Sequence, residues 1–233
     1  MEKYDPRDAI IEEKFRRIKF SVLVGSGKGG VGKSTIASIL ALGLSRKFSV
    51  GLLDLDVHGP VIPEIFGLEN VEPKESKKGL IPPEKYGVKV MSLGFFTEKE
   101  PVPMRGNAKT DAIKEILAIT NWGTLDFLVV DLPPGTGDET LTSVKYITNS
   151  KGAVLVTIPS KISLSVVERA IRLFRELRVP ILALISNMAY YSLGGEKISV
   201  LGEANVEGLA RKYGIDEVVE IPIDPNVSKA IET

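Results

Sequence analysis

The chain has 233 residues, of which 43% are hydrophobic, and its 30 basic and 30 acidic side chains give a formal net charge of zero. This balance provides no overall attraction to nucleic acid or an anionic membrane, and the lack of cysteine excludes disulfides, thiolate metal ligands and cysteine nucleophiles in these residues. No secretory signal and no apolar run of membrane-spanning length is present, so we expect a cytoplasmic protein with one α/β domain over residues 1–233.

The chain begins with a predicted amphipathic helix over residues 6–18. Asp5 is a favourable N-cap, and Pro6 suits the first helical position, where its missing N–H has no intrahelical partner to lose. The apolar run 20–24 then predicts a strand, and apolar residues at helical spacing predict a helix over 35–46. We expect the charged first helix to pack on the outside of the sheet.

Between that strand and that helix lies the stretch from Gly25 to Thr35, which reads GSGKGGVGKST. Its later part fits the phosphate-binding pattern G-x-x-x-x-G-K-[ST] at every fixed position. The glycines allow consecutive backbone N–H groups to face phosphate oxygens, and the helix N-terminus adds partial positive charge. A glycine-rich turn with a chance lysine is the alternative. The predicted nucleotide-binding residues are Gly27, Lys28, Gly29, Gly30, Val31, Gly32, Lys33, Ser34 and Thr35.

Two of these residues have more specific expected roles. Lys33 is expected to reach the β- and γ-phosphates, and Ser34 is expected to bind Mg²⁺. An acidic segment follows the next predicted strand, residues 48–54. Because strand C-terminal ends face the ligand crevice in an open parallel sheet, these acids are expected to point towards the phosphates. We assign Asp56 as the residue that orients the attacking water, with a loop-capping role as the alternative.

The middle of the chain leads to a second acidic strand end. His58, the only histidine, is interpreted as structural or solvated rather than as a metal ligand. The following segments are predicted as an exposed excursion, a strand, a loop and a helix, over 69–87, 88–93, 101–106 and 108–120. The apolar run 125–131 then ends in Asp131, which is the pattern of a Walker B strand. Asp131 is expected to hold Mg²⁺ through a bound water, because Mg²⁺ keeps several of its waters.

The rest of the chain continues to alternate between strand and helix patterns. Residues 133–138 follow Asp131 directly, and their backbone is expected to sense the γ-phosphate and change shape when it leaves. Strands are predicted over 153–158 and 181–186, with an amphipathic helix over 163–177 between them. This alternation indicates right-handed βαβ units. The expected fold is a single doubly wound parallel sheet with the P-loop after its first core strand.

Lys28, directly after the first glycine of the loop, extends the motif to K-G-G-V-G-K-S. This sequence resembles the deviant Walker A motif of the MinD/ParA/nitrogenase-iron-protein group of P-loop ATPases. Further stretches look like the Mrp/NBP-type branch of that group, and together they cover nearly the whole chain. They are residues 25–35, 54–60, 87–94, 104–106, 122–138, 187–188 and 221–224.

The resemblance implies two further sets of site residues. In the group, the extra lysine crosses a dimer interface, so the resemblance implies that Lys28 is a cation acting on the partner subunit's nucleotide. The expected catalytic residues are then Lys28, Lys33 and Asp56. A solvated Lys28 is the alternative. Asn187 is expected to contact the adenine edge, and a strand cap is its alternative role. The base is expected to be lined by Pro222, Ile223 and Asp224. Neither segment spells the N-K-x-D pattern, so the resemblance implies ATP rather than GTP.

The chain departs from this branch shortly after Asn187, where members that carry iron–sulfur clusters have a C-x-x-C pair. Because such clusters need soft sulfur ligands, cluster carriage cannot be transferred by residue matching. Ser160 also stands where the family often has glutamine. No terminal amphipathic helix is expected, which argues against MinD-like membrane binding. At residues 53–59 and 96–106 the chain looks like a cysteine-less offshoot of this branch. That offshoot is similar to an archaeal ATPase that helps insert nickel into hydrogenases with a small metallochaperone.

We therefore interpret the chain as a Mg²⁺-dependent ATPase, with ATP or ADP and Mg²⁺ as cofactors, that forms a homodimer in the ATP state. It is expected to serve metal-centre assembly, as a metallocluster carrier or a nickel-insertion accessory. The expected partner is a protein client or metallochaperone, with no membrane and no nucleic acid. A ParA/MinD-like positioning ATPase and a non-hydrolysing nucleotide switch that docks partners are the alternatives.

Overall fold

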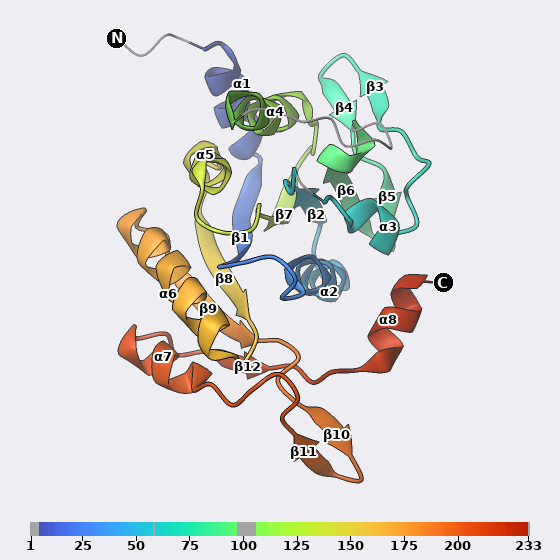
Figure 1. Ribbon diagram of the computed structural model, residues 1–233. Helices are drawn as coiled ribbons and strands as arrows, with labels where there is room; N and C mark the ends of the chain where they lie inside the picture. Colours follow the sequence, from blue (N-terminus) through green and yellow to red (C-terminus); the bar gives the residue numbers. More distant parts are fainter. Residues whose placement is uncertain (1–4, 58, 97–105, 233) are drawn as a thin grey trace.

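A twisted eight-stranded sheet runs through the centre of the computed structural model, which describes residues 5–57, 59–96 and 106–232 (Figure 1). The strand order is β12-β9-β8-β1-β7-β2-β6-β5. Two separate hairpins, β3–β4 and β10–β11, project from it. The strands are β1 (Ile18–Ser26), β2 (Val50–Asp54), β3 (Lys74–Ser76), β4 (Gly79–Ile81), β5 (Glu84–Lys85), β6 (Val88–Ser92), β7 (Leu125–Asp131), β8 (Lys151–Thr157), β9 (Ile181–Ser186), β10 (Tyr191–Leu193), β11 (Glu196–Ile198) and β12 (Val218–Glu220).

Helices follow most of the parallel strands and return the chain to the other end of the sheet. Every neighbouring pair in the sheet is parallel except the edge pair β5–β6. This confirms the predicted α/β class with a mostly parallel sheet, and the antiparallel edge strand is an addition that the prediction lacked. The helices are α1 (Arg7–Phe15), α2 (Lys33–Ser45), α3 (Ile62–Ile65), the 3₁₀ turn η1 (Leu93–Phe95), α4 (Gly106–Ile119), α5 (Asp138–Tyr146), α6 (Lys161–Glu176), α7 (Val206–Lys212) and α8 (Pro225–Glu232).

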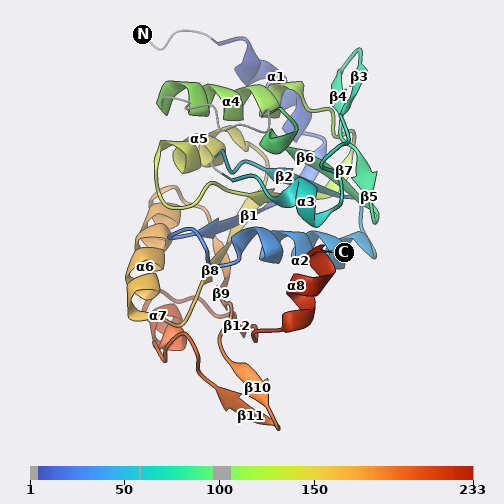
Figure 2. The same ribbon diagram turned by 45° about the vertical axis from the view of Figure 1, so that its right-hand side comes forward.

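The two faces of the sheet are buried by different helices (Figures 1 and 2). Helices α1, α4, α5, α6 and α7 contribute to one hydrophobic cluster, and α2 and α3 contribute to the other. Successive strand residues divide between the clusters: Leu52 packs in the α2 cluster and Leu53 in the opposite one. Because both faces are covered, the central strands read as continuous apolar runs. These runs are what made the strands predictable.

Most predicted elements are found within a few residues of their expected bounds. The strand over 125–131 and the strand over 181–186 are observed with the same limits. Within 69–87 the prediction of an irregular excursion is incomplete, because this segment contains the β3–β4 hairpin and β5. The predicted loop over 101–106 falls almost wholly outside the described residues, and so does His58.

The expectation that no terminal amphipathic helix is present is wrong, because residues Pro225–Glu232 form helix α8. Helix α8 begins at Pro225, where Asp224 caps it by accepting hydrogen bonds from the backbone and side-chain nitrogens of Asn226. The aspartate preceding a proline is the signal that the sequence offered for this helix. Across the described ranges, no helix has the length and apolarity needed to cross a bilayer.

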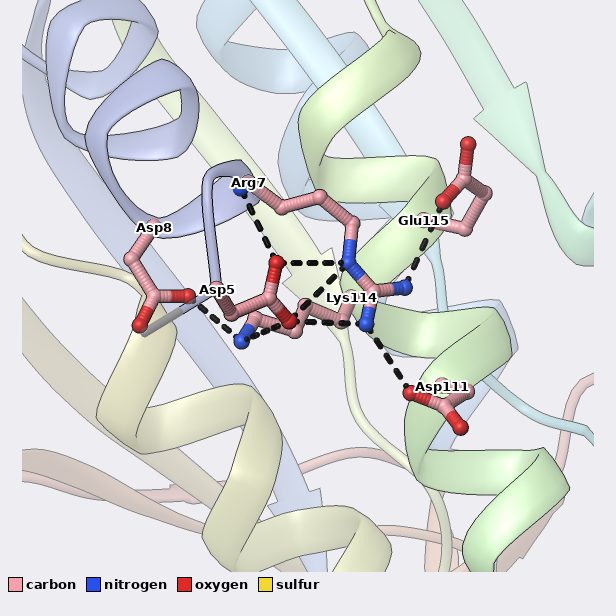
Figure 3. Close-up of polar contacts among 6 residues, drawn as sticks. All are labelled: Asp5, Arg7, Asp8, Asp111, Lys114 and Glu115. Carbon is pink, nitrogen blue, oxygen red and sulfur yellow. Dashed lines mark hydrogen bonds and ion pairs between the residues drawn. The ribbon is translucent and has the colours of Figure 1, made fainter. Parts of the chain in front are cut away.

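An ion-pair network fastens α1 to α4 (Figure 3). Asp5 lies between two cations: its carboxylate is 2.8 Å from the Arg7 guanidinium and 2.6 Å from the Lys114 ammonium. The helix begins at Arg7, and Asp5 also accepts a hydrogen bond from the Arg7 backbone N–H. The Arg7 and Lys114 side chains hold the pKa of the Asp5 carboxyl well below its usual range. Below this network, Phe15 packs fully buried in the core.

The network predicts a pH-dependent contribution to stability from Asp5. Because its pKa is lowered in the folded chain, its contribution is present above the ordinary aspartate pKa of about 4 and is lost as the pH falls towards the folded value. We expect Asp5→Asn to lower the melting temperature at pH 7 more than Asp111→Asn does, since Asp111 is 65% exposed and, among the residues that the structure describes, has Arg7 as its one ion-pair partner. Melting temperatures of both variants, measured from pH 2 to pH 7 in steps of about one pH unit, test this prediction. A gap between the two variants that persists unchanged at the lowest pH would refute it.

Candidate functional site

The glycine-rich loop joins the end of β1 to the start of α2 at the C-terminal edge of the sheet. Gly30 and Gly32 have φ angles of 75° and 81°, which side chains other than glycine rarely adopt. At Gly27 a Cβ atom would lie 2.5 Å from the backbone of Val166, so α6 packs directly against the loop. The Ser26 hydroxyl donates to the Lys28 carbonyl and closes the first turn. These contacts explain the glycine positions of the motif.

Asn187, directly after β9, holds the other side of this loop. Its amide nitrogen donates to the Val31 carbonyl at 2.9 Å, and its side chain is buried. A Cβ on Gly32 would approach the same amide nitrogen to 2.2 Å. Asn187, which was predicted to contact the base, therefore anchors the P-loop through its side chain. Neither that prediction nor the strand-cap alternative included this contact.

Lys33 and Ser34 meet Asp131 at the first turn of α2. The Lys33 ammonium lies 2.7 Å from one carboxylate oxygen of Asp131, and the Ser34 hydroxyl donates to the other at 2.6 Å. Lys33 is 6% exposed and Asp131 is fully buried. The structure thus brings together the three residues that were predicted to hold phosphate and Mg²⁺. All three groups match the oxygen and cation chemistry that a Mg²⁺–phosphate complex needs.

Asp54 adds a second buried carboxylate that the sequence analysis did not single out. It pairs in register with Asp131 across the β2–β7 ladder and accepts hydrogen bonds from the Ser92 hydroxyl and the backbone N–H of Asp56. Burial, and then the charge of Asp131, raise the pKa of Asp54 to about 7. Burial also raises the pKa of Asp131, against the opposing effect of Lys33. An acid at the end of an apolar strand was the available signal for Asp54.

Asp56 lies at the entrance to this acidic centre. One of its carboxylate oxygens is 4.0 Å from the Lys33 ammonium, and the other accepts a hydrogen bond from the Gly59 backbone at 3.3 Å. The loop-capping contact considered as the alternative is therefore present. The same side chain faces the P-loop lysine, as the catalytic assignment requires. The two roles are compatible because they use different oxygens.

The segment after β7 lies against the P-loop. The Gly135 backbone donates to the Ser26 carbonyl at 3.0 Å, and the Thr140 hydroxyl donates to the carbonyls of Pro133 and Gly135. Through these bonds, α5 is linked to the loop that was predicted to sense the γ-phosphate. A displacement of residues 133–137 would therefore be transmitted to the start of α5.

The two predicted base-binding segments run side by side. Ala189 donates a backbone hydrogen bond to Ile221, and Ile223 donates one to Tyr190. Pro222 and Ile223 are partly buried, whereas Asp224 is exposed and caps α8. The structure thus places the 222–224 segment beside the residues that follow Asn187, whose side chain contacts the P-loop.

Lys28 stands apart from the buried centre on the outer part of the loop. Its side chain is half-buried, and within the described ranges its ammonium has no hydrogen bond or ion pair. Lys33, five residues later, already occupies the inner position beside Asp131. The two lysines of the motif are thus directed to different surroundings.

Comparisons with known proteins agree with this geometry. Residues 17–233 match the ParA family model, described as NUBPL iron-transfer P-loop NTPase. An iron–sulfur cluster carrier protein of Aquifex aeolicus is 44% identical over 93% of this chain, and the chain spans 61% of that relative's length. A nucleotide-binding protein of Archaeoglobus fulgidus, solved in complex with ADP, is 39% identical with a TM-score of 0.85, over 97% of this chain and 90% of its own.

A more distant likeness concerns the fold alone. The septum site-determining protein MinD of Pyrococcus horikoshii has a TM-score of 0.62 at 18% identity, over 92% of this chain and 85% of its own. This likeness shows that the chain shares its arrangement of strands and helices with that protein. The resemblance read from Lys28 and the flanking stretches is confirmed.

The close contact between Gly32 and Asn187 predicts that Gly32→Ala impairs the nucleotide site. The new methyl group would meet the Asn187 amide at 2.2 Å in a backbone conformation that costs alanine roughly 1–2 kcal/mol. We expect at least about tenfold weaker ATP binding by calorimetry, equivalent to about 1.4 kcal/mol. Gly43→Ala is the control, because Gly43 lies inside α2 where an added methyl group meets no other atom. It should leave ATP affinity unchanged and should be neutral or stabilising for the fold. Unchanged ATP affinity of Gly32→Ala would contradict the packing described here.

Proposed function

The chain belongs to the ParA-type P-loop NTPases of the NUBPL iron-transfer family, and we propose on this basis that it is a Mg²⁺-dependent ATPase serving metal-centre assembly. The observation that carries the proposal is the contact of Asp131 with both Lys33 and Ser34. These are the groups that a P-loop uses for phosphate and Mg²⁺. The proposed enzyme is one domain over residues 1–233, with ATP or ADP as its nucleotide.

The charges at the site support the need for a metal ion. Two buried carboxylates, Asp54 and Asp131, lie near the buried ammonium of Lys33, which forms an ion pair with Asp131 and acts on Asp54 only through its charge. Burial disfavours the ionised form of both acids, so an additional cation in their vicinity would stabilise them as carboxylates. Ser34 and Asp131 are the proposed holders of Mg²⁺, with Asp131 acting through a bound water. The bound ion would offset negative charge on the β- and γ-phosphates.

Hydrolysis requires an attacking water and a stabilised γ-phosphate. We assign the water to Asp56, whose carboxylate is 14% exposed and 4.0 Å from the Lys33 ammonium. Lys33 would turn from Asp131 to the phosphate oxygens when ATP enters, since both are anionic partners for one ammonium. Residues 133–137, which are bonded to the P-loop through Gly135, would then register the presence of the γ-phosphate.

Adenine is the proposed base, and a homodimer is the proposed ATP-bound state. Asn187, which contacts the P-loop, and the 222–224 segment, which pairs with the residues after Asn187, are the proposed contacts of the base. The partly exposed Lys28, which makes no ion pair within the described ranges, is the proposed trans-acting cation. A point charge that crosses to a partner's γ-phosphate would stabilise charge on the transferring group.

The role in metal-centre assembly follows from the relatives, several of which are named iron–sulfur cluster carrier proteins. This chain contains no cysteine, and the described residues hold no cluster of histidine and acidic side chains suited to a metal. Its residues therefore do not fit thiolate ligation of iron. We propose that the ATPase cycle acts on a protein client or metallochaperone that supplies the metal ligands itself. Nickel insertion is one form of this role.

Two variants separate the proposed hydrolytic residue from the proposed dimer residue. Asp56→Ala should bind ATP, dimerise and lose most hydrolysis, because water orientation contributes to the transition state and little to ground-state binding.

Lys28→Ala should bind ATP, but it should dimerise less than the wild type does and should not hydrolyse ATP. Calorimetry, ATPase assays at several protein concentrations, and sedimentation with a non-hydrolysable ATP analogue test both. Normal hydrolysis by Lys28→Ala, independent of protein concentration, would reject action in trans.

The absence of cysteine predicts that the purified chain holds no iron–sulfur cluster. Anaerobic reconstitution with iron and sulfide should leave iron and acid-labile sulfide far below one equivalent per chain. The same treatment of the Aquifex aeolicus relative, named as a cluster carrier, is the comparison. A stoichiometric cluster with visible absorption on this chain would overturn the assignment of the ligands to a partner.

A further inference from the structure

A cavity of about 250 Å³ lies at the N-terminal ends of the strands, on the opposite end of the sheet from the P-loop. It is formed by α1, the turn between β3 and β4, and the segment before β7. Because Arg17 precedes β1 and Trp122 precedes β7, the cavity is at the N-terminal ends of the strands, whereas the P-loop follows a C-terminal end. Its walls are Ile10, Glu13, Lys14, Arg17, Lys78, Asn121, Trp122 and Gly123.

The charges around this cavity are mostly positive. Three of its lining residues are cationic, and the only acid among them, Glu13, is 3.7 Å from Arg17. Lys89 stands behind the wall and donates a hydrogen bond to the Trp122 carbonyl at 2.9 Å. In a chain of zero net charge, this is a local excess of cations around a concave space. Such an excess attracts anions.

Lys14 is the cation that most needs a counter-ion. Its side chain is partly buried, and it donates to the Ala118 carbonyl while no carboxylate pairs with it in the described part of the chain. Burial lowers the pKa of Lys14, although the charge of Glu13 opposes this change. A partly desolvated ammonium without a charged partner is unfavourable, and an anion in the cavity would offset that cost.

Trp122 is the aromatic residue among those that line the cavity. It is 2% exposed, and its six-membered ring packs against β2, where a Cβ on Gly51 would lie 2.8 Å from it. The indole N–H lies on the opposite edge of the ring system and has no acceptor in the described residues. A buried tryptophan N–H normally finds a partner. The cavity thus combines cationic side chains with one edge of a mostly buried tryptophan.

We propose that this cavity binds a small organic anion bearing carboxylate or phosphate groups, with its carbon skeleton against Trp122 and its charges towards Lys14, Arg17 and Lys78. The size of the space supports this class of ligand. Pockets for drug-sized molecules begin at about 300 Å³, so 250 Å³ suits a compact metabolite rather than a nucleotide or a peptide. The site is separate from the proposed ATPase centre and does not depend on it.

The chain contains one tryptophan, which is the wall of this cavity, so its fluorescence reports directly on occupancy. We would titrate the full chain, with the nucleotide site saturated by Mg-ADP, with tricarballylate in one arm and glycerol 3-phosphate in the other. Glycerol serves as the uncharged comparator. We expect a saturable change in fluorescence with at least one anion, weakened by added salt, and none with glycerol. The arm that responds identifies carboxylate or phosphate recognition.

A matched pair of variants tests the location. Lys78→Ala removes a positive charge that lines the cavity from an exposed turn. Lys161→Ala removes a positive charge at the start of α6, at the C-terminal ends of the strands, and is the matched control. Lys78→Ala should weaken the anion about three- to tenfold, as loss of one partly exposed charge allows, and Lys161→Ala should not. The proposal is overturned if neither anion gives saturable binding by about 10 mM, or if both variants respond as wild type does.

Discussion

Lys33 and Asp131 form an ion pair of 2.7 Å between side chains that are 6% and 0% exposed. Removing one partner of such a pair leaves an uncompensated buried charge, at a cost of about 3–5 kcal/mol. The pair exists because parallel strands β1, β2 and β7 end at the same edge, where Asp54 and Asp131 stand in register. The glycine loop, the Asp56 turn and the 133–137 segment are all arranged around this buried charge.

Much of this centre could be predicted from the sequence, because each part depends on local pattern. Apolar runs ending in Asp54 and Asp131 mark buried parallel strands, and the loop motif fixes Lys33 and Ser34. Asp54 was not singled out, because its role depends on its register with Asp131, which only strand order determines. The contact of Asn187 with Val31 joins residues 156 positions apart, and no local pattern indicates it.

The elements that were not predicted are short, or their role depends on contacts between distant segments. The strands of the two hairpins and β12 are only three residues long, too short to show a period, and most of their side chains are exposed. Helix α8 follows the Asp224-Pro225 signal, but it lacks a long apolar stripe. The cavity beside Trp122 is assembled from three distant segments whose residues carry no motif. Chemistry that depends on tertiary assembly therefore lies beyond local patterns, even where every contributing residue is ordinary.

The Lys33–Asp131 centre is proposed to bind the phosphates of ATP with Mg²⁺, and Asn187 with residues 222–224 is proposed to select adenine. Calorimetric titration of the full chain with ATP and GTP, each with Mg²⁺ and with a chelator in its place, measures both properties. We expect the tightest binding for Mg-ATP, weaker binding without Mg²⁺, and weaker binding of Mg-GTP. Equal affinity for ATP and GTP, or affinity for ATP that does not change when Mg²⁺ is removed, would contradict it.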